Sequence, residues 1–138
     1  MVAAYENLTR DRRLKHIYNL CDFELRARKL LPKALAEYVF GGAEVNTTLA
    51  TNRRQFDDHT LLTRVLSDVS SRHTAHGLLG QTYAAPFGIA PVGVSALIAF
   101  NGDNVMASAA YKLGIPMILS GSSLTRLEEV KQHHPQVW

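Results

Sequence analysis

The chain has 138 residues, enough for about one domain, and its 46% hydrophobic and 20% charged residues are ordinary for a globular protein. The net charge of +3 is mildly basic, and no run of like charges is long enough to be an interaction tail. No stretch reaches the roughly 20 apolar residues of a membrane span, and no secretory signal is visible. We therefore expect a cytoplasmic protein with no transmembrane segment.

Residues 1–20 are polar and charged and are predicted to form an N-terminal arm. Their densest basic stretch, residues 10–15, is interpreted as a solvated helix face, with nucleic-acid contact as the alternative. Because no aromatic residues accompany these charges, no nucleic-acid partner is expected. The single cysteine, Cys21, excludes an internal disulfide and is expected to be a buried thiol rather than a nucleophile.

Residues 21–85 are predicted to contain helices and a hairpin. An apolar stripe over 21–40 indicates helix, with Asp22 as a candidate cap. Pro32 is expected to start a second helix over 33–40, which Gly41 ends.

The next stretch, residues 46–57, is interpreted as a short helix or an ordered loop, with Asn46 among its candidate caps. Weak alternation over 61–70 and glycine-punctuated residues over 77–86 then predict two short strands. Joined by "SRHTAH", these strands would form the hairpin.

The pattern changes over 86–138. Continuous apolar runs at 87–92 and 115–119 are typical of strands that are buried on both faces. Helices are predicted over 103–113, ended by Gly114, and over 124–132, where Thr125 and Glu128 have capping-box spacing. With a third strand starting at 136–138, this alternation predicts a parallel α/β fold that is the first part of something longer.

Sites in parallel α/β folds form at the carboxyl ends of strands. Two such ends are readable, "APVG" at 90–93 and "LSGS" at 119–122. Small residues there let a flat ligand lie against free backbone groups, although turn chemistry explains the glycines equally well. No glycine-rich nucleotide motif is present, and His73 and His76 lack a third ligand, so no metal is expected.

At these residues the sequence resembles the amino-terminal part of the FMN-dependent α-hydroxy acid dehydrogenase and oxidase family, which includes glycolate oxidase, L-lactate dehydrogenase and mandelate dehydrogenase. The likeness runs from about residue 28 to 138. It is carried by the order and spacing of five segments: "KLLPKALAEYVFGGA", "TLATNRRQF", "LLTRVLSDVSSRHTAHGLLGQ", "PFGIAPVG" and "LGIPMILSGSSLTRLEEV".

The resemblance implies an incomplete TIM (β/α)8 barrel, with N-terminal helices, a hairpin that closes the barrel bottom, and the first two β/α units. It implies FMN as cofactor and a small 2-hydroxy acid as substrate. The implied cofactor-binding residues are Pro91, Val92, Gly93 and Ser120, and the implied substrate-binding residue is Tyr38. For Tyr38 the alternative is a helix-packing aromatic. Val92 and Gly93 stand where the family has threonine and alanine, so only backbone contacts are expected there.

The activity that the resemblance implies is oxidation of an L-2-hydroxy acid, such as lactate or glycolate, to the 2-oxo acid, with hydride passing to flavin N5. The family's catalytic histidine and arginine would lie further on, so this fragment is expected to hold no catalytic residue and to be inactive alone. The parent is expected to be a homo-oligomer, with peripheral membrane association left open. The alternatives are a noncatalytic truncated remnant and an FMN-dependent isomerase-type relative, against which the Tyr38 region argues.

Overall fold

The computed structural model describes residues 14–138, and the chain divides into an N-terminal unit, Met1–Leu61, and a C-terminal unit, Leu62–Trp138. Most of the predicted N-terminal arm, with the arginines of the basic stretch, lies outside the described residues. The three-part division at residues 20 and 85 stays a prediction.

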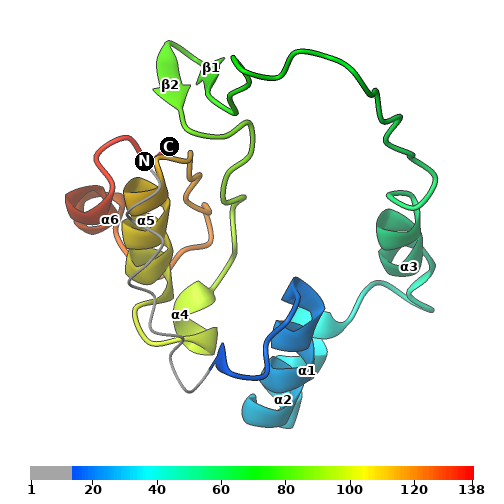
Figure 1. Ribbon diagram of the computed structural model, residues 1–138. Helices are drawn as coiled ribbons and strands as arrows, with labels where there is room; N and C mark the ends of the chain where they lie inside the picture. The colour runs from blue at the N-terminus through cyan, green and yellow to red at the C-terminus, as the bar shows by residue number, and fades with distance from the viewer. Residues whose placement is uncertain (1–13) are drawn as a thin grey trace. The chain divides into compact units, whose positions relative to one another are not determined.

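The N-terminal unit contains three helices, α1 (Leu20–Leu30), α2 (Lys33–Phe40) and α3 (Thr47–Arg54) (Figure 1). Pro32 is the N-cap of α2, as predicted, because its ring fixes φ near the helical value and it has no N–H to leave unpaired. Gly41 ends α2 as predicted, and its N–H donates to the Glu37 carbonyl at 2.9 Å. Residues 46–57 are helical over α3.

The cap of α1 is Asn19 rather than Asp22. Asn19 Oδ1 accepts hydrogen bonds from the N–H groups of Cys21 and Asp22, and Asp22 Oδ2 accepts from the Asn19 N–H at 3.0 Å. These reciprocal bonds are a capping box, in which Asp22 is the third helical residue. The prediction of a buried Cys21 is wrong, since this thiol is exposed and its Sγ accepts from Arg53 Nη2 at 2.6 Å.

The hairpin of the C-terminal unit is shorter than predicted. Strand β1 (His76–Leu78) pairs antiparallel with β2 (Gln81–Tyr83). The prediction of a strand over 61–70 is wrong, because no strand forms there and the backbone bends at Leu66, whose φ is 60°. Asp68 Oδ1 accepts from the Ser70 N–H at 2.9 Å, a bond that competes with strand pairing.

Three helices follow the hairpin, α4 (Ser95–Ile98), α5 (Gly102–Leu113) and α6 (Leu127–His133). Gly114 ends α5 at φ 62°, as predicted for a glycine in the left-handed region. Helix α4 was not predicted from the sequence. The capping-box prediction for Thr125 is wrong, because the N-cap of α6 is Arg126 and makes no side-chain capping bond.

The extended segments between these helices pair in parallel. The Ile89 N–H donates to the Pro116 carbonyl at 2.9 Å, and the Ile118 N–H donates to the Ile89 carbonyl at 3.0 Å. This pattern makes a parallel bridge between Ile89 and Met117. The predicted parallel pairing of the two apolar runs is therefore confirmed, although the regular ladder covers less of each run than predicted.

The chain's last residue continues the same arrangement. The Trp138 N–H donates to the Met117 carbonyl at 3.1 Å, and the Leu119 N–H donates to the Trp138 carbonyl at 2.6 Å. The segment 115–119 thus lies between 87–92 on one side and 136–138 on the other.

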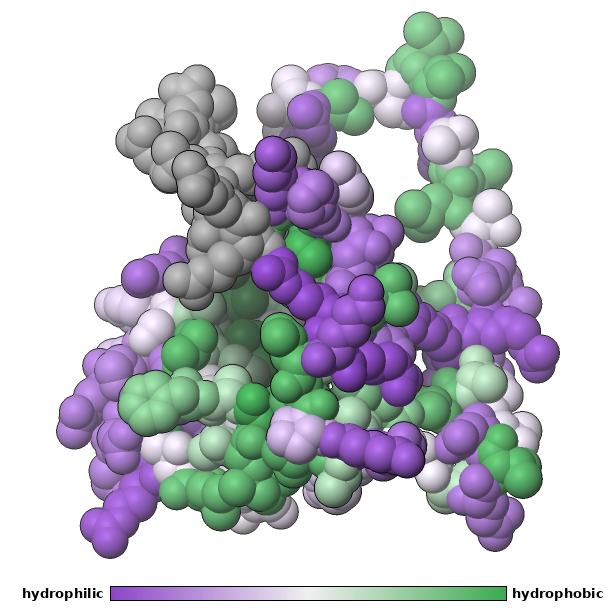
Figure 2. Space-filling model, turned by 90° about the horizontal axis from the view of Figure 1, so that it is seen from below, coloured by the Kyte–Doolittle hydropathy of each residue, from purple (hydrophilic) through white to green (hydrophobic). Residues whose placement is uncertain are grey.

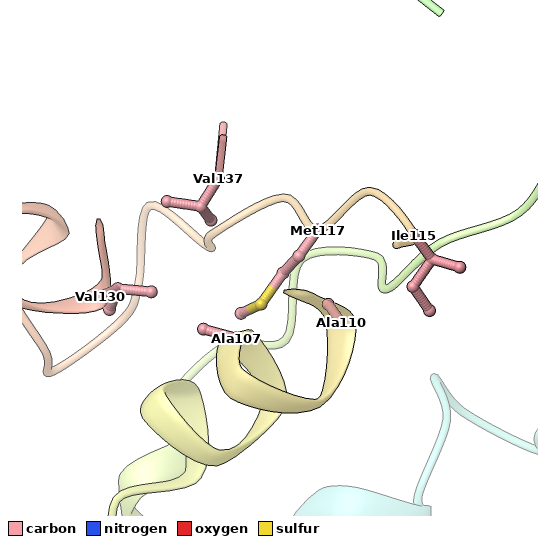
Figure 3. Packing of buried hydrophobic residues seen from close by; sticks show 6 residues of the cluster. All are labelled: Ala107, Ala110, Ile115, Met117, Val130 and Val137. Atoms are coloured by element: carbon pink, nitrogen blue, oxygen red, sulfur yellow. The ribbon is translucent and has the colours of Figure 1, made fainter. Parts of the chain in front are cut away.

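The core of the C-terminal unit lies between α5, α6 and one face of the extended segments. Figure 3 shows its six buried apolar residues: Ala107, Ala110, Ile115, Met117, Val130 and Val137. The Met117 side chain, only 1% exposed, points toward α5 and fills the space beside its two small alanines. Ile118, next along the chain, is 41% exposed, as expected for the opposite face of a strand.

Many apolar side chains are exposed in both units. Leu20, Leu30 and Phe56 in the N-terminal unit and Phe87 and Phe100 in the C-terminal unit are examples. Figure 2 shows apolar surface, in green, on one face of the molecule. Within residues 14–138, no helix is long and apolar enough to cross a membrane.

Candidate functional site at the strand ends

The carboxyl ends of the first two extended segments lie beside each other. The Val94 N–H donates to the Ser122 carbonyl at 3.1 Å, which joins the loop after residues 87–92 to the turn after 115–119. A Cβ placed on Gly93 would lie 3.8 Å from Ser120 Oγ and 3.6 Å from Ser122 Cβ. Two of the residues predicted to bind the cofactor, Gly93 and Ser120, are therefore neighbours on one rim.

Ser120 opens a tight turn. Its Oγ accepts from the Ser122 N–H at 3.1 Å, and its carbonyl accepts from the Ser123 N–H at 3.0 Å. Because a hydroxyl can donate as well as accept, the partly buried Ser120 side chain retains a proton for a ligand acceptor.

The loop after the first segment offers a ligand its backbone. Pro91 has no N–H, so the amide donors of this loop are those of Val92 and Gly93. The Val92 side chain lines a small apolar pocket of about 230 Å³ against α4 and α5. Chemistry at this loop is therefore limited to main-chain hydrogen bonds and van der Waals contact.

Val94 has a backbone conformation that a β-branched residue rarely adopts, with φ 46° and ψ 33°. Such strained residues cluster at ligand sites, where the surrounding structure holds them in place. Here the bond from the Val94 N–H to Ser122 contributes to that constraint. The sequence pattern did not indicate this left-handed backbone, because a valine that follows an apolar run predicts extended backbone.

The other predicted site residue, Tyr38, lies on α2 in the N-terminal unit, and its side chain is 68% exposed. A helix-packing role would bury the ring, so this exposure leaves the phenol accessible. Its role in binding a substrate remains a prediction.

The histidines of the C-terminal unit have other surroundings. His134 is buried, where Nε2 donates to the Ile115 carbonyl at 3.2 Å and Nδ1 accepts from the Gln136 N–H at 3.3 Å. His133 Nδ1 lies 3.3 Å from Ser108 Oγ. In the described part of the chain, no three potential ligands are grouped to hold a metal ion.

An apolar pocket of the C-terminal unit lies between the hairpin and the extended segments. It has a volume of about 360 Å³, and its lining includes His76, Leu78 and Tyr83 from the hairpin, with Gly88 and Pro116 from the segment starts. The candidate site at the carboxyl ends is instead an open surface, which we call the wall.

Comparison with known proteins shows which proteins this chain is similar to. Residues 27–138 match the family described as FMN-dependent dehydrogenase. The chain is 39% identical over 116 residues to an L-lactate dehydrogenase of Caulobacter sp. (strain K31), which covers 84% of this chain and 30% of that protein. It is 34% identical to an L-lactate oxidase of Lysinibacillus sphaericus (strain C3-41), covering 83% of this chain and 30% of that protein.

Solved structures agree with the sequence relatives. A soluble mutant of the membrane-associated (S)-mandelate dehydrogenase from Pseudomonas putida superposes with a TM-score of 0.82 at 32% identity. The likeness covers 88% of this chain and 35% of that structure. The chain thus spans about a third of the length of the proteins it matches. Because the family match extends over most of its residues, this chain belongs to the FMN-dependent dehydrogenase family.

Proposed function

We propose that this chain supplies one wall of an FMN site in an oxidoreductase that converts an L-2-hydroxy acid to its 2-oxo acid. The observation that carries the proposal is the contact between Gly93 and the Ser120–Ser122 turn at the strand ends. The family supports it, since it is described as FMN-dependent. The relatives support the substrate class, because their names specify oxidation of lactate or mandelate.

The wider fold of the proposal is a TIM (β/α)8 barrel, of which the parallel segments would be the first strands. The pocket between the hairpin and the segments supports this placement, because hairpin residues His76 and Tyr83 line it together with Gly88 and Ile118. A hairpin in that position would close the end of a barrel opposite to its active site.

The residues at the strand ends suit an FMN ring. When bound, FMN accepts the two electrons that leave the substrate. The Val92 and Gly93 amides would donate to the polar edge of the ring, and the absence of a side chain at Gly93 lets the ring approach the backbone. The Ser120 hydroxyl would add a hydrogen bond. Tyr38 would donate its phenol proton to the substrate carboxylate.

The remaining parts of the proposal concern the parent protein. We infer a small substrate such as lactate or glycolate, a homo-oligomeric parent and a cytoplasmic location. Likeness to a protein described as a monotopic membrane (S)-mandelate dehydrogenase, with a TM-score of 0.83 at 31% identity, supports peripheral membrane association of the parent.

An FMN titration followed by amide NMR tests the site. The amides of Val92, Gly93 and Ser120 are expected to shift on addition of millimolar FMN, because an open wall binds weakly. The amides of β1 and β2 are an internal control, since they lie at the other end of the segments, and they should stay unmoved. Shifts confined to the hairpin, or no shifts at the strand ends, would contradict the proposal. Ser120→Ala should weaken the response at Gly93.

A further inference from the structure

A buried carboxylate lies behind the candidate wall. Asp103, in the first turn of α5, is only 1% exposed, and its Oδ2 accepts a hydrogen bond from Ser123 Oγ at 2.7 Å. Burying a carboxylate is costly unless hydrogen bonds compensate it. The proposed function assigns no role to this residue.

Ser123 connects that carboxylate to the turn. Its Oγ lies 2.7 Å from Asp103 Oδ2 and 3.1 Å from the Thr125 carbonyl, and it accepts from the Thr125 N–H at 3.0 Å. A hydroxyl has one proton, and a carboxylate is the stronger acceptor, so this proton goes to Asp103. The Ser123 N–H donates in turn to the Ser120 carbonyl.

The same turn fixes the hydroxyl that faces the candidate site. The Ser122 N–H donates to Ser120 Oγ at 3.1 Å, and the Ser122 carbonyl accepts from Val94. Asp103 is therefore bonded to Ser123, Ser123 to the Ser120 carbonyl, and the intervening Ser122 amide to the Ser120 side chain.

We propose that Asp103 is a positioning residue, whose buried carboxylate holds the turn 120–123 and thereby sets the direction of the Ser120 hydroxyl. That this hydroxyl direction matters for binding a flavin rests on the proposed function, whereas the link from Asp103 to Ser120 does not depend on it. A residue that only stabilised α5 would leave the Ser120 rotamer unchanged when altered.

Amide hydrogen exchange and side-chain couplings of the full chain test this link. In both Asp103→Asn and Ser123→Ala, exchange of the Ser122 amide should rise by about 10-fold, as for the loss of one hydrogen bond that protects an amide. The coupling constant that reports on the Ser120 χ1 angle should change from the value of a single rotamer to an average over several rotamers. The double variant should add nothing to Ser123→Ala, because Ser123→Ala already removes the bond to Asp103 together with the bond that Ser123 Oγ accepts from the Thr125 N–H.

Ser108→Ala is the matched control, because it removes a hydroxyl from α5 whose partner is His133 rather than the turn. The amide of Ile118, bonded to Ile89, reports on the unit as a whole. Equal acceleration at Ser122 and Ile118 would overturn the proposal in favour of a role in stability, and so would an unchanged Ser120 rotamer. If Asp103→Asn does not fold, Ser123→Ala decides, since Ser123 is only partly buried.

The two proposals fail in different ways. A loosened Ser120 in these variants, together with a wild-type chain whose strand ends show no FMN shifts, supports the positioning role and contradicts the FMN site. FMN shifts at Gly93 that persist unchanged in Ser123→Ala, with an unmoved Ser120 rotamer, support the FMN site and overturn the positioning role.

Discussion

Gly88 occupies a place where two extended segments approach too closely for a side chain. A Cβ there would overlap the Pro116 carbonyl oxygen and lie 2.6 Å from the Pro116 Cγ. We expect Gly88→Ala to lower the free energy of unfolding by about 1–3 kcal/mol, because the segments must move apart. Urea unfolding followed by the fluorescence of Trp138, the chain's single tryptophan, measures this effect.

The control for Gly88 is Gly77, whose added Cβ would meet nothing within 4 Å. Gly77→Ala is expected to change the free energy of unfolding by less than about 0.5 kcal/mol. Equal losses in the two variants would show that the close approach at Pro116 is not the cause.

A second residue-scale prediction concerns Glu24. The pKa of its carboxyl is lowered, first by the hydrogen bond from Arg28, at 2.9 Å, and then by Arg53, at 3.2 Å. Arg28→Gln should therefore raise the Glu24 pKa toward its ordinary value, and by more than Arg53→Gln does. NMR titration of the Glu24 side chain measures both values, and a larger effect of Arg53 would contradict this order.

The sign of the pH dependence follows from the lowered pKa. A carboxyl that titrates lower in the folded chain than in the unfolded chain adds stability above the unfolded pKa. This contribution is lost as the pH falls through the folded pKa. Solvent reaches the Glu24 pairs, so added salt should weaken the effect.

Some residue roles could be predicted from the sequence because the residue's own covalent chemistry dictates them. Pro32 starts α2 through its fixed φ, and Gly114 ends α5 through its access to positive φ. The Asp103–Ser123 bond could not be predicted, because 20 residues separate its partners and only the fold brings them together. The cap of α1 was missed because Asn19 and Asp22 each suit a helix start.

At the scale of elements, the turn between β1 and β2 offers a stabilising change. Leu79 and Gly80 have φ values of 46° and 79°, which is the pattern of a type I′ turn. Leucine is strained there, whereas asparagine tolerates the left-handed region. Because Leu79 is 76% exposed, Leu79→Asn loses little packing and should raise the free energy of unfolding by about 0.5–1 kcal/mol.

Thermal unfolding monitored by Trp138 fluorescence checks this change. Leu78→Asn is the comparison, since Leu78 lies in β1 and lines the apolar pocket, and it should lower the melting temperature. A lower melting temperature for Leu79→Asn as well would mean that the leucine side chain contributes more packing than its exposure indicates.

The order of elements in the C-terminal unit followed from hydrophobic patterning, whereas the lengths of the strands did not. Apolar runs at 87–92 and 115–119 indicated burial on both faces, and their parallel pairing is confirmed at Ile89 and Met117. How far a strand extends depends on the partners that pair with it, which is information about tertiary structure. The pattern over 61–70 failed as a strand because Asp68 bonds its own local backbone.

At the scale of the whole molecule, the proposed binding wall is distinct from a reaction centre in the chemistry of its side chains. The residues at the strand ends of the C-terminal unit are Pro91, Val92, Gly93 and Ser120, none of which takes a proton from a hydroxy acid at neutral pH. The buried imidazole of His134 lies at the start of the segment 115–119, away from this rim, and both its ring nitrogens are engaged with backbone groups. Within this unit, the groups placed at the rim suit binding of a flat ligand.

A chain of these 138 residues is therefore expected not to oxidise lactate or glycolate. The assay is reduction of a dye acceptor by purified chain with added FMN, compared with FMN alone and with an L-lactate dehydrogenase as positive control. Rates equal to those of FMN alone are expected, because binding at an open wall brings no proton acceptor to the substrate hydroxyl. Dye reduction that increases in proportion to the amount of chain, and that Ser120→Ala diminishes, would mean that this wall already contains a working reaction centre.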